Sequence, residues 1–392
     1  MIPTIAQTWG RLAIALLACF AGSAGASLSA GTESESRNAD NSPHLLVGQR
    51  LFEKETFGGN GRTCDTCHGR ETGTVSPEDA QRRMARDPHD PLFAGDGSDD
   101  GAGNGAERML THATVLVTVP LADNVRLAAD PIATTAVFRR GIPTTLNTPA
   151  LDPVLMWDGR QPSLDAQAQS AILGHAAATR MPTGKELERI AEFERSRPFF
   201  SSHTLWSFAV NGRPPVLPPG RTESEKRGRE FFEDVPLGKG NSKRGTCAVC
   251  HSGPMLNETN EFIPVAPRRR GGRFQSIFVS ELNAIGNPVQ EFIFRASDGT
   301  TKRVLTPDPG RAAVTGSMDF EHLNAFKIPP LWGVANTAPY FHDNSAKTLE
   351  DVMLHYKKFF AIVTDPMIDG DPAIDLTEQN QQDIIAFMKL LR

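Results

Sequence analysis

The sequence predicts a mainly α-helical protein in two halves, with long loops and a few short strands. Apolar residues at helical spacing within residues 384–391 predict an amphipathic helix near the end of the chain. Thr-x-x-Glu pairs at 183–186 and 222–225 have the spacing of capping boxes and predict two further helix starts. A proline-rich segment at 211–221 interrupts both helix and sheet. The clearest strand signals are residues 114–119 and 291–295.

The first residues of the chain predict export. In residues 1–26, Arg11 precedes an apolar run at 12–18 and small residues follow, which is typical of a secretory signal peptide. The apolar run is shorter than the ~20 residues of a membrane-spanning helix, so we expect no membrane span. Cys19 offers an alternative, the lipidated cysteine of a lipoprotein. Residues 27–43, rich in Ser, Gly, Asn and Glu, predict a flexible lead-in.

Length and charge narrow the class of protein. The 392 residues suffice for two cores of ordinary size. We expect an N-terminal domain at 44–210, a linker at 211–221 and a C-terminal domain at 222–392. A net charge of −5 with 22% charged residues argues against both nucleic-acid binding and global disorder.

Each half repeats an architecture. A short apolar helix, at 45–52 in one half and 226–232 in the other, precedes a loop and a CxxCH motif. The motifs use every cysteine beyond the predicted leader: Cys64, Cys67, Cys247 and Cys250. In c-type haem attachment the two thiols bond one porphyrin and the following histidine ligates its iron. Zinc binding or a thioredoxin-like dithiol is the alternative, but neither needs a histidine after both motifs. We therefore predict two haem c groups in two cytochrome c-like domains, with His68 and His251 as iron ligands.

Several further motifs occur in order along both halves. They are MWDGR at 156–160, PGR at 309–311, FKIPPLW at 326–332, TAPYFHD at 337–343 and TLED at 348–351. With the CxxCH pair, this series resembles the bacterial di-haem cytochrome c peroxidases and their relative MauG. Residues 69–138 and 258–304 match poorly. The resemblance implies a redox enzyme that passes electrons between two haems.

The resemblance places the sixth ligand of the second haem at Tyr356, where typical peroxidases have Met and MauG has Tyr. The local pattern agrees, because residues 348–351 cap a helix whose apolar face includes Met353 and Tyr356. We expect His355 to point away from that face. Met353, one turn earlier, is the alternative ligand, with Tyr356 then a core aromatic.

The first haem departs from the family. The resemblance places Gln167 in its distal pocket and Trp157 between the haems as an electron relay, although Trp157 could simply fill the core. The family's acid–base Glu corresponds to a position near Ala177, where this chain has no carboxylate. His175 is the nearest titratable substitute, and it could instead ligate the iron or be structural. No His lies just before residues 140–144, where typical peroxidases carry a resting ligand.

The resemblance also implies a calcium ion held by backbone oxygens of Thr337 and Pro339 and by an Asn side chain. Gly141 occupies the Asn position and supplies no side chain. Residues 96–107 separately have the oxygen spacing of an EF-hand loop, but Gly103 replaces its usual apolar residue. A solvated acidic loop is the favoured interpretation.

Together these features predict a periplasmic oxidoreductase that uses hydrogen peroxide at the first haem. Its partner would be a small redox protein as electron donor, or a substrate protein modified as by MauG. The alternatives are a non-catalytic di-haem electron carrier and an oxygen-activating haem protein. The sequence leaves open whether the chain forms a homodimer.

Overall fold

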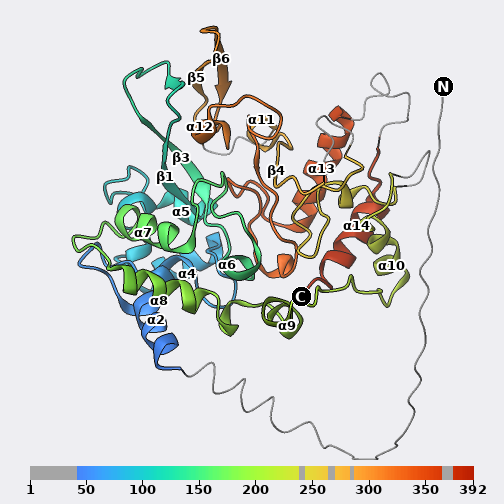
Figure 1. The fold of residues 1–392 in the computed structure, drawn as a ribbon, viewed down its shortest axis with the longest axis horizontal. Coiled ribbons are helices and arrows are strands. Elements are labelled where there is room, and N and C mark those ends of the chain that lie inside the picture. Colours follow the sequence, from blue (N-terminus) through green and yellow to red (C-terminus); the bar gives the residue numbers. More distant parts are fainter. Residues whose placement is uncertain (1–41, 238–242, 264–269, 283–286, 364–373) are drawn as a thin grey trace, which may run out of the picture. The chain divides into compact units, whose positions relative to one another are not determined.

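The computed structural model describes residues 42–237, 243–263, 270–282, 287–363 and 374–392 (Figure 1). Residues Ser42–Arg392 make up one unit by their internal contacts. The predicted signal peptide, Cys19 and residues 27–41 of the lead-in lie outside the described residues. Among the helices that the structure describes, none combines the length and apolar character that crossing a bilayer requires.

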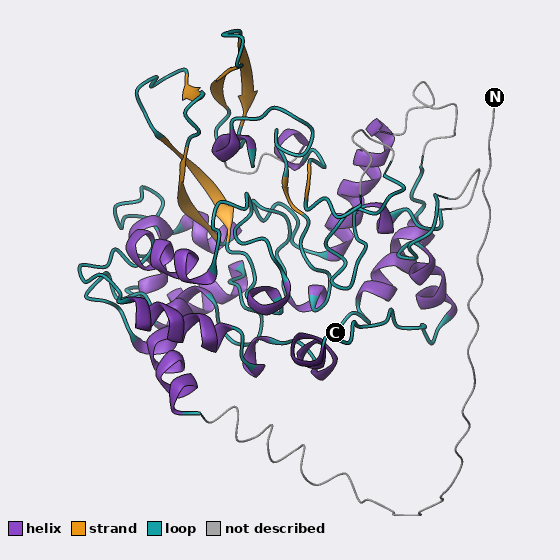
Figure 2. Cartoon of the chain, in the orientation of Figure 1, coloured by secondary structure: helices purple, strands orange, loops and turns teal. Residues whose placement is uncertain are grey.

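Helices dominate and strands are short, as predicted (Figure 2). The longer helices are α2 (Pro43–Lys54), α4 (Pro77–Arg86), α7 (Leu164–Gly174), α8 (Gly184–Glu194), α9 (His203–Asn211), α10 (Glu223–Glu230), α13 (Leu349–Val363) and α14 (Glu378–Met388). The short helices are α3 (Cys64–Cys67), α5 (Glu107–His112), α6 (Thr148–Leu151), α11 (Val279–Leu282) and α12 (Ala312–Thr315). Two 3-10 turns matter below, η2 (Gly95–Gly97) and η4 (Cys247–Val249).

The predicted helix signals are confirmed. Thr183 and Thr222 cap α8 and α10 in reciprocal capping boxes. At the start of α13 the amide of Asp351 donates to the Thr348 hydroxyl at 3.1 Å. The predicted apolar stripe is buried: Ile384, Phe387 and Met388 lie on α14, and Leu391 lies just beyond the end of that helix at Met388. Burying this stripe is what fixes the helix, since isolated helices of this length are marginal in water.

The strands form three small antiparallel sheets. They pair as β1 (Thr114–Pro120) with β3 (Thr135–Gly141), β2 (Val125–Leu127) with β5 (Gln290–Arg295) and β5 with β6 (Thr301–Thr306), and β4 (Phe274–Gln275) with β7 (Phe326–Lys327). β1 and β5 were predicted. Their partners β3 and β6 were missed, because β3 carries two arginines and β6 is mostly exposed, so neither shows a strong alternating pattern. In the second sheet β2, from the first half of the chain, adds to the β5–β6 hairpin.

Each CxxCH motif follows a helix that crosses a later helix at a glycine. A Cβ on Gly48 of α2 would lie 2.2 Å from the Arg189 carbonyl of α8, and one on Gly228 of α10 would lie 1.9 Å from the Asp383 carbonyl of α14. Only glycine permits such approaches. Phe52 and Phe232 follow these glycines by four residues and are buried. We expected a repeat of architecture without sequence, but the short pattern Gly-x-x-x-Phe recurs because both crossings need it.

A buried ion network ties segments from both halves. Arg140 is 1% exposed, and its guanidinium donates to Asp158 at 2.6 Å and to Asp308 at 2.7 and 2.9 Å. Lys327 donates to Asp152 at 2.9 Å, again across the two halves. Buried charges persist only when paired and hydrogen-bonded, so these contacts specify how the segments meet. The division into two domains stays a prediction.

Candidate haem sites

The two CxxCH histidines share one local geometry. Nδ1 of His68 donates to the Gly73 carbonyl at 2.8 Å, and Nδ1 of His251 donates to the Leu256 carbonyl at 2.8 Å, in each case five residues further along. This bond fixes the tautomer and leaves Nε2 as the nitrogen with a free lone pair, as in metal-ligating histidines. Burial lowers the pKa of both imidazoles, that of His251 to about 4, although the backbone hydrogen bonds oppose the shift. Both rings are therefore neutral, the form that binds iron.

The four cysteines fit covalent haem attachment better than thiolate chemistry. All are free of disulfides. Burial raises the pKa of each thiol, that of Cys250 to about 12. A reactive or metal-binding cysteine needs the opposite environment, one that stabilises the thiolate. A neutral thioether suits these apolar positions, so the residues present fit haem c.

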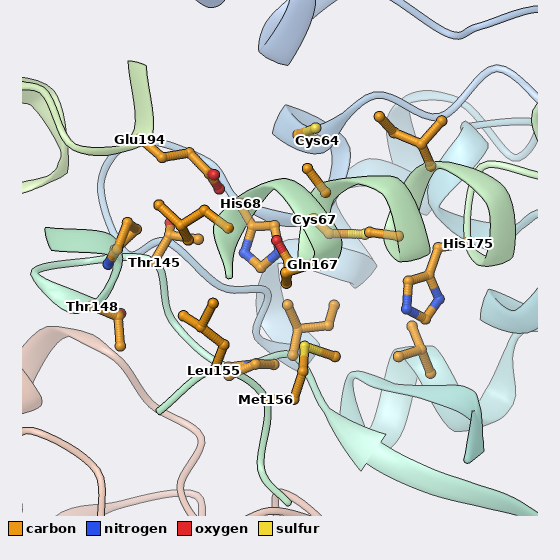
Figure 3. A pocket seen from close by; sticks show the side chains of 18 of the residues that line it. Cys64, Cys67, His68, Thr145, Thr148, Leu155, Met156, Gln167, His175 and Glu194 are labelled. Atoms are coloured by element: carbon orange, nitrogen blue, oxygen red, sulfur yellow. The ribbon is translucent and has the colours of Figure 1, made fainter. Parts of the chain in front are cut away.

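A cavity in the first half gathers the residues predicted for the first haem (Figure 3). Among its lining residues are Cys64, Cys67, His68, Trp157, Gln167 and His175. The space between its lining atoms is about 1290 Å³, part of it open to solvent. The structure thus brings these residues together, while their individual roles stay predictions.

His175 is held by two residues that sequence analysis did not assign to the pocket. Its Nδ1 is hydrogen-bonded to a carboxylate oxygen of Asp96, in η2, and the other oxygen of Asp96 pairs with Arg62. Asp96 was expected in a solvated acidic loop, but its side chain instead faces these two partners. Because Asp96 lies 79 residues from His175, no local pattern could have joined them.

Glu194, at the end of α8, is a second residue that the sequence did not reveal. It is 5% exposed, lines the first cavity, and its Oε2 has no hydrogen-bond partner within the described residues. Figure 3 shows it on the opposite side of the pocket from His175. Burial raises the pKa of Glu194 to about 8. The cavity therefore does contain a carboxyl group, whereas Ala177, at the family position, is exposed with a φ of 49°.

Trp157 lies where segments of the two halves meet. Its indole Nε1 donates to the Gly141 carbonyl at 2.8 Å, and its own carbonyl accepts from the Lys327 amide at 2.8 Å. The first bond orients the indole ring toward β3, and the second links the backbone of Trp157 to β7 in the other half. The indole is also part of the cavity wall. This position is compatible with the predicted relay, which the contacts alone do not test.

In the second half, α13 carries Tyr356 and Met353. Burial raises the pKa of Tyr356 well above its usual range, and repulsion from Cys250 and Cys247 adds to the shift. Tyr356 and Cys247 pack against the same apolar core. Met353 is 4% exposed within the apolar core. The expectation that His355 points away from the buried face was wrong. It is 3% exposed, and its ring is hydrogen-bonded to the Ile277 carbonyl at 2.8 Å, a partner 78 residues away.

The residues around Gly141 fit the family's calcium ligand set poorly. A Cβ on Gly141 would lie 2.0 Å from Oδ1 of Asn344. The space that the family's Asn side chain would need at this position is therefore filled by Asn344. Asn344 instead donates to the carbonyls of His112 and Ala113 at 2.9 and 3.0 Å. Within the described residues no group of three or more His, Cys, Asp or Glu side chains could hold a metal ion. A calcium ion at Thr337 and Pro339 stays untested.

Comparison with curated protein sequences finds relatives named MauG or cytochrome c peroxidase. No family model matches the chain. The methylamine utilization protein MauG of Methylophilus methylotrophus is 25% identical over 274 residues, which cover 64% of this chain and 68% of that protein. Cytochrome c551 peroxidase of Nitrosomonas europaea is 25% identical over 226 residues, covering 54% and 56%. A cytochrome-c peroxidase of Pseudomonas sp. strain SCT is 24% identical over 265 residues, covering 60% and 64%.

Solved structures give weaker matches. A MauG-like protein associated with microbial copper homeostasis is 19% identical, with a TM-score of 0.49 over 89% of this chain and 88% of that one. The diheme peroxidase BthA of Burkholderia thailandensis is 16% identical, with a TM-score of 0.43 over 89% and 86%. The chain matches between about half and two thirds of the length of its curated relatives, and these sequence matches confirm its resemblance to the bacterial di-haem cytochrome c peroxidase and MauG family.

Proposed function

We propose that the chain is an exported, periplasmic di-haem c-type oxidoreductase that reacts with hydrogen peroxide at its first haem. The observation that carries the proposal is the first cavity, where a CxxCH motif shares one space with Gln167, His175 and Trp157. The relatives named MauG and cytochrome c peroxidase support a redox function of this kind. Two cytochrome c-like domains, at 44–210 and 222–392, would carry one haem each.

The bound haems would supply the electrons that reduce peroxide, while this chain's residues bind and orient it. Cys64, Cys67 and His68 hold the first haem in this proposal, and Cys247, Cys250 and His251 hold the second. Gln167 and His175 offer hydrogen-bonding groups inside a largely apolar cavity. Such groups bind a small polar oxidant strongly because few waters compete with it.

Tyr356 would complete the coordination of the second haem, and Trp157 would carry electrons between the two haems. An anionic tyrosinate ligand stabilises ferric or higher oxidation states, whereas Met raises the potential. The second haem would thus hold oxidising equivalents and deliver them to a partner protein, as the hypothesis of a MauG-like protein modification requires. Either a small redox donor or a substrate protein is compatible with this proposal.

One observation favours a second candidate, a non-catalytic electron-transfer protein. His175 is hydrogen-bonded through Nδ1 to a carboxylate, which is also the usual arrangement of a metal-ligating histidine. If Nε2 ligated the first iron, both haems would be closed to peroxide. The two candidates therefore differ in whether the first haem is open at rest.

The test is the electron paramagnetic resonance spectrum of the ferric holoprotein, with and without hydrogen peroxide, for wild type and Tyr356→Phe. We expect a high-spin signal that peroxide abolishes, beside a low-spin signal that Tyr356→Phe alters. Met353→Leu is the matched control on the same helix, conserves volume and should leave both signals unchanged. Two low-spin signals indifferent to peroxide would overturn the open first haem in favour of the carrier.

A further inference from the structure

Three charged or ionisable side chains from distant segments meet beside the first cavity, which His175 and Arg62 line. His175 is the C-cap residue of α7, Asp96 belongs to η2, and Arg62 precedes α3. Asp96 accepts from His175 with one carboxylate oxygen and from Arg62 with the other. Arg62 also donates to the His175 carbonyl at 3.1 Å. The histidine is thus held by its ring and by its backbone.

Arg62 is itself held in place by several hydrogen bonds, and it therefore fixes the position of the Asp96 carboxylate. It is 2% exposed, and its Nε and second amino group donate to the Pro91 and Leu92 carbonyls, each at 2.8 Å. The backbone at Gly97 packs directly against Arg62. A Cβ there would lie 2.2 Å from the Arg62 guanidinium and 2.0 Å from the Leu92 carbonyl, so this position needs glycine. A planar guanidinium that makes four hydrogen bonds, from Nε and both amino groups, is a rigid support.

The charge state of Asp96 suits this support. Burial alone would raise the pKa of Asp96, but the hydrogen bond from His175, the charge of His175 and the pairing with Arg62 outweigh burial and lower it. Asp96 is therefore a permanent carboxylate and accepts hydrogen bonds only. An acceptor at Nδ1 requires the proton to sit on Nδ1, so Nε2 carries the lone pair.

The imidazole lines the same cavity as Gln167 and Met156 (Figure 3). Its Nε2 has no hydrogen-bond partner within the described residues and is the nitrogen left for a ligand in the cavity. In this tautomer Nε2 can accept a proton, and Asp96 stabilises the resulting imidazolium, as the buried aspartate does in a Ser-His-Asp triad. Ala177, at the position of the family's acid–base Glu, has no group that could transfer a proton.

We propose that Asp96 is a positioning residue that fixes His175, through Nδ1, as the proton-transferring group of the first cavity. This inference rests on the proposed function. A proton would pass from one peroxide oxygen to Nε2 and from Nε2 to the other oxygen, so that the O–O bond breaks and the protonated oxygen leaves as water. Two electrons supplied by the haems and two protons from solvent would reduce the remaining oxygen to the second water.

The test uses the holoprotein and four variants, Asp96→Asn, Asp96→Glu, His175→Ala and the double variant Asp96→Asn with His175→Ala. One readout is independent of turnover: the rate of cyanide binding to the ferric protein, which depends on a base that takes the proton of hydrogen cyanide. The second readout is the rate of the optical change after mixing with peroxide. Asp100→Asn is the matched control, because Asp100 holds the same loop through Ala102 and Asn104 but does not touch His175.

We expect His175→Ala to slow both rates by about 10²–10⁴-fold, the usual contribution of general acid–base catalysis. Asp96→Asn should approach that loss, because an amide that donates to Nδ1 selects the wrong tautomer. Asp96→Glu should recover part of the rate, Asp100→Asn should match wild type, and the double variant should be no slower than His175→Ala. The high-spin signal of the resting protein should persist in every variant.

Two results would overturn the inference while leaving peroxide chemistry intact. One is an Asp96→Asn protein that reacts at the wild-type rate, and the other is an independent loss from Asp96→Asn in the His175→Ala background. A resting low-spin signal that His175→Ala converts to high spin would identify His175 as an iron ligand and overturn it as well. By contrast, a fully haem-loaded wild type that binds neither cyanide nor peroxide would overturn the proposed function itself.

Discussion

The surroundings of the two CxxCH motifs differ in polarity. Near the first, four charged side chains act on the thiol of Cys67, and they are Arg62, Asp96, Arg83 and Asp90. Near the second, burial alone accounts for the raised pKa of Cys250. Apolar and aromatic residues dominate there, including Trp332, Tyr356 and Phe360. This difference fits a division of labour between the two proposed haems, because moving protons needs fixed charges and donors, whereas holding oxidising equivalents needs dry, rigid surroundings.

The largest expected effect comes from removing one haem. Replacing Cys64 and Cys67 together by Ala should lower the covalent haem content from two per chain to one and abolish the reaction with peroxide. The same double replacement of Cys247 and Cys250 should also leave one haem per chain, but the remaining haem should still bind cyanide. Haem content by pyridine haemochrome absorbance checks both variants. Equal cyanide binding by the two variants would break the division of labour.

The buried ion network between the halves should give the next largest effect. Arg140→Leu leaves Asp158 and Asp308 buried without their shared partner, which should lower the free energy of unfolding by about 3–5 kcal/mol. The control is Arg303→Ala, which breaks an exposed pair with Glu291 and should cost at most about 1 kcal/mol. Denaturant titration measures both. A loss for Arg140→Leu no larger than the control's would show that the network does not specify how the halves meet.

Glu194, in the first cavity, should make the free energy of unfolding depend on pH. Burial raises its pKa to about 8 in the folded protein, against 4.5 for an exposed glutamate, so between these pH values the folded state binds more protons than the unfolded state. The unfolding free energy therefore falls as pH rises through that window. Glu194→Gln should remove this dependence and be more stable than wild type above pH 8, by up to a few kcal/mol. Parallel unfolding curves from pH 5 to 9 would contradict the assignment.

The smallest effects should be shared by both halves. Gly48→Ala and Gly228→Ala each force a Cβ against a carbonyl of the crossing helix, and each should cost about 1–3 kcal/mol of unfolding free energy. Gly174→Ala, where a Cβ would meet nothing within 4 Å, is the matched control and should be neutral or stabilising by up to about 1 kcal/mol. Thermal unfolding of the three variants measures this. A cost at only one crossing would show that the two helix pairs are not equivalent.

Local patterns predicted the elements that local physics controls. The capping boxes at Thr183 and Thr222, the stripe ending at Leu391 and the strands β1 and β5 all depend on residues a few positions apart. The prediction for His355 was wrong, because a helical pattern shows which residues share a face but not that the Ile277 carbonyl approaches from another segment. The strands β3 and β6 could not be predicted because β3 carries two arginines and β6 is mostly exposed, so neither has a strong apolar alternation.

The sequence by itself determined the two haem-attachment motifs, the mainly helical composition and the resemblance to a peroxidase family, since each is written in short, ordered spacings. Only the tertiary structure decided that Asp96 and Arg62 hold His175, that Glu194 faces the first cavity, and that Asn344 fills the space beside Gly141. These contacts join residues far apart along the chain. Which distant side chains meet is decided by how whole elements pack, and no single spacing encodes that.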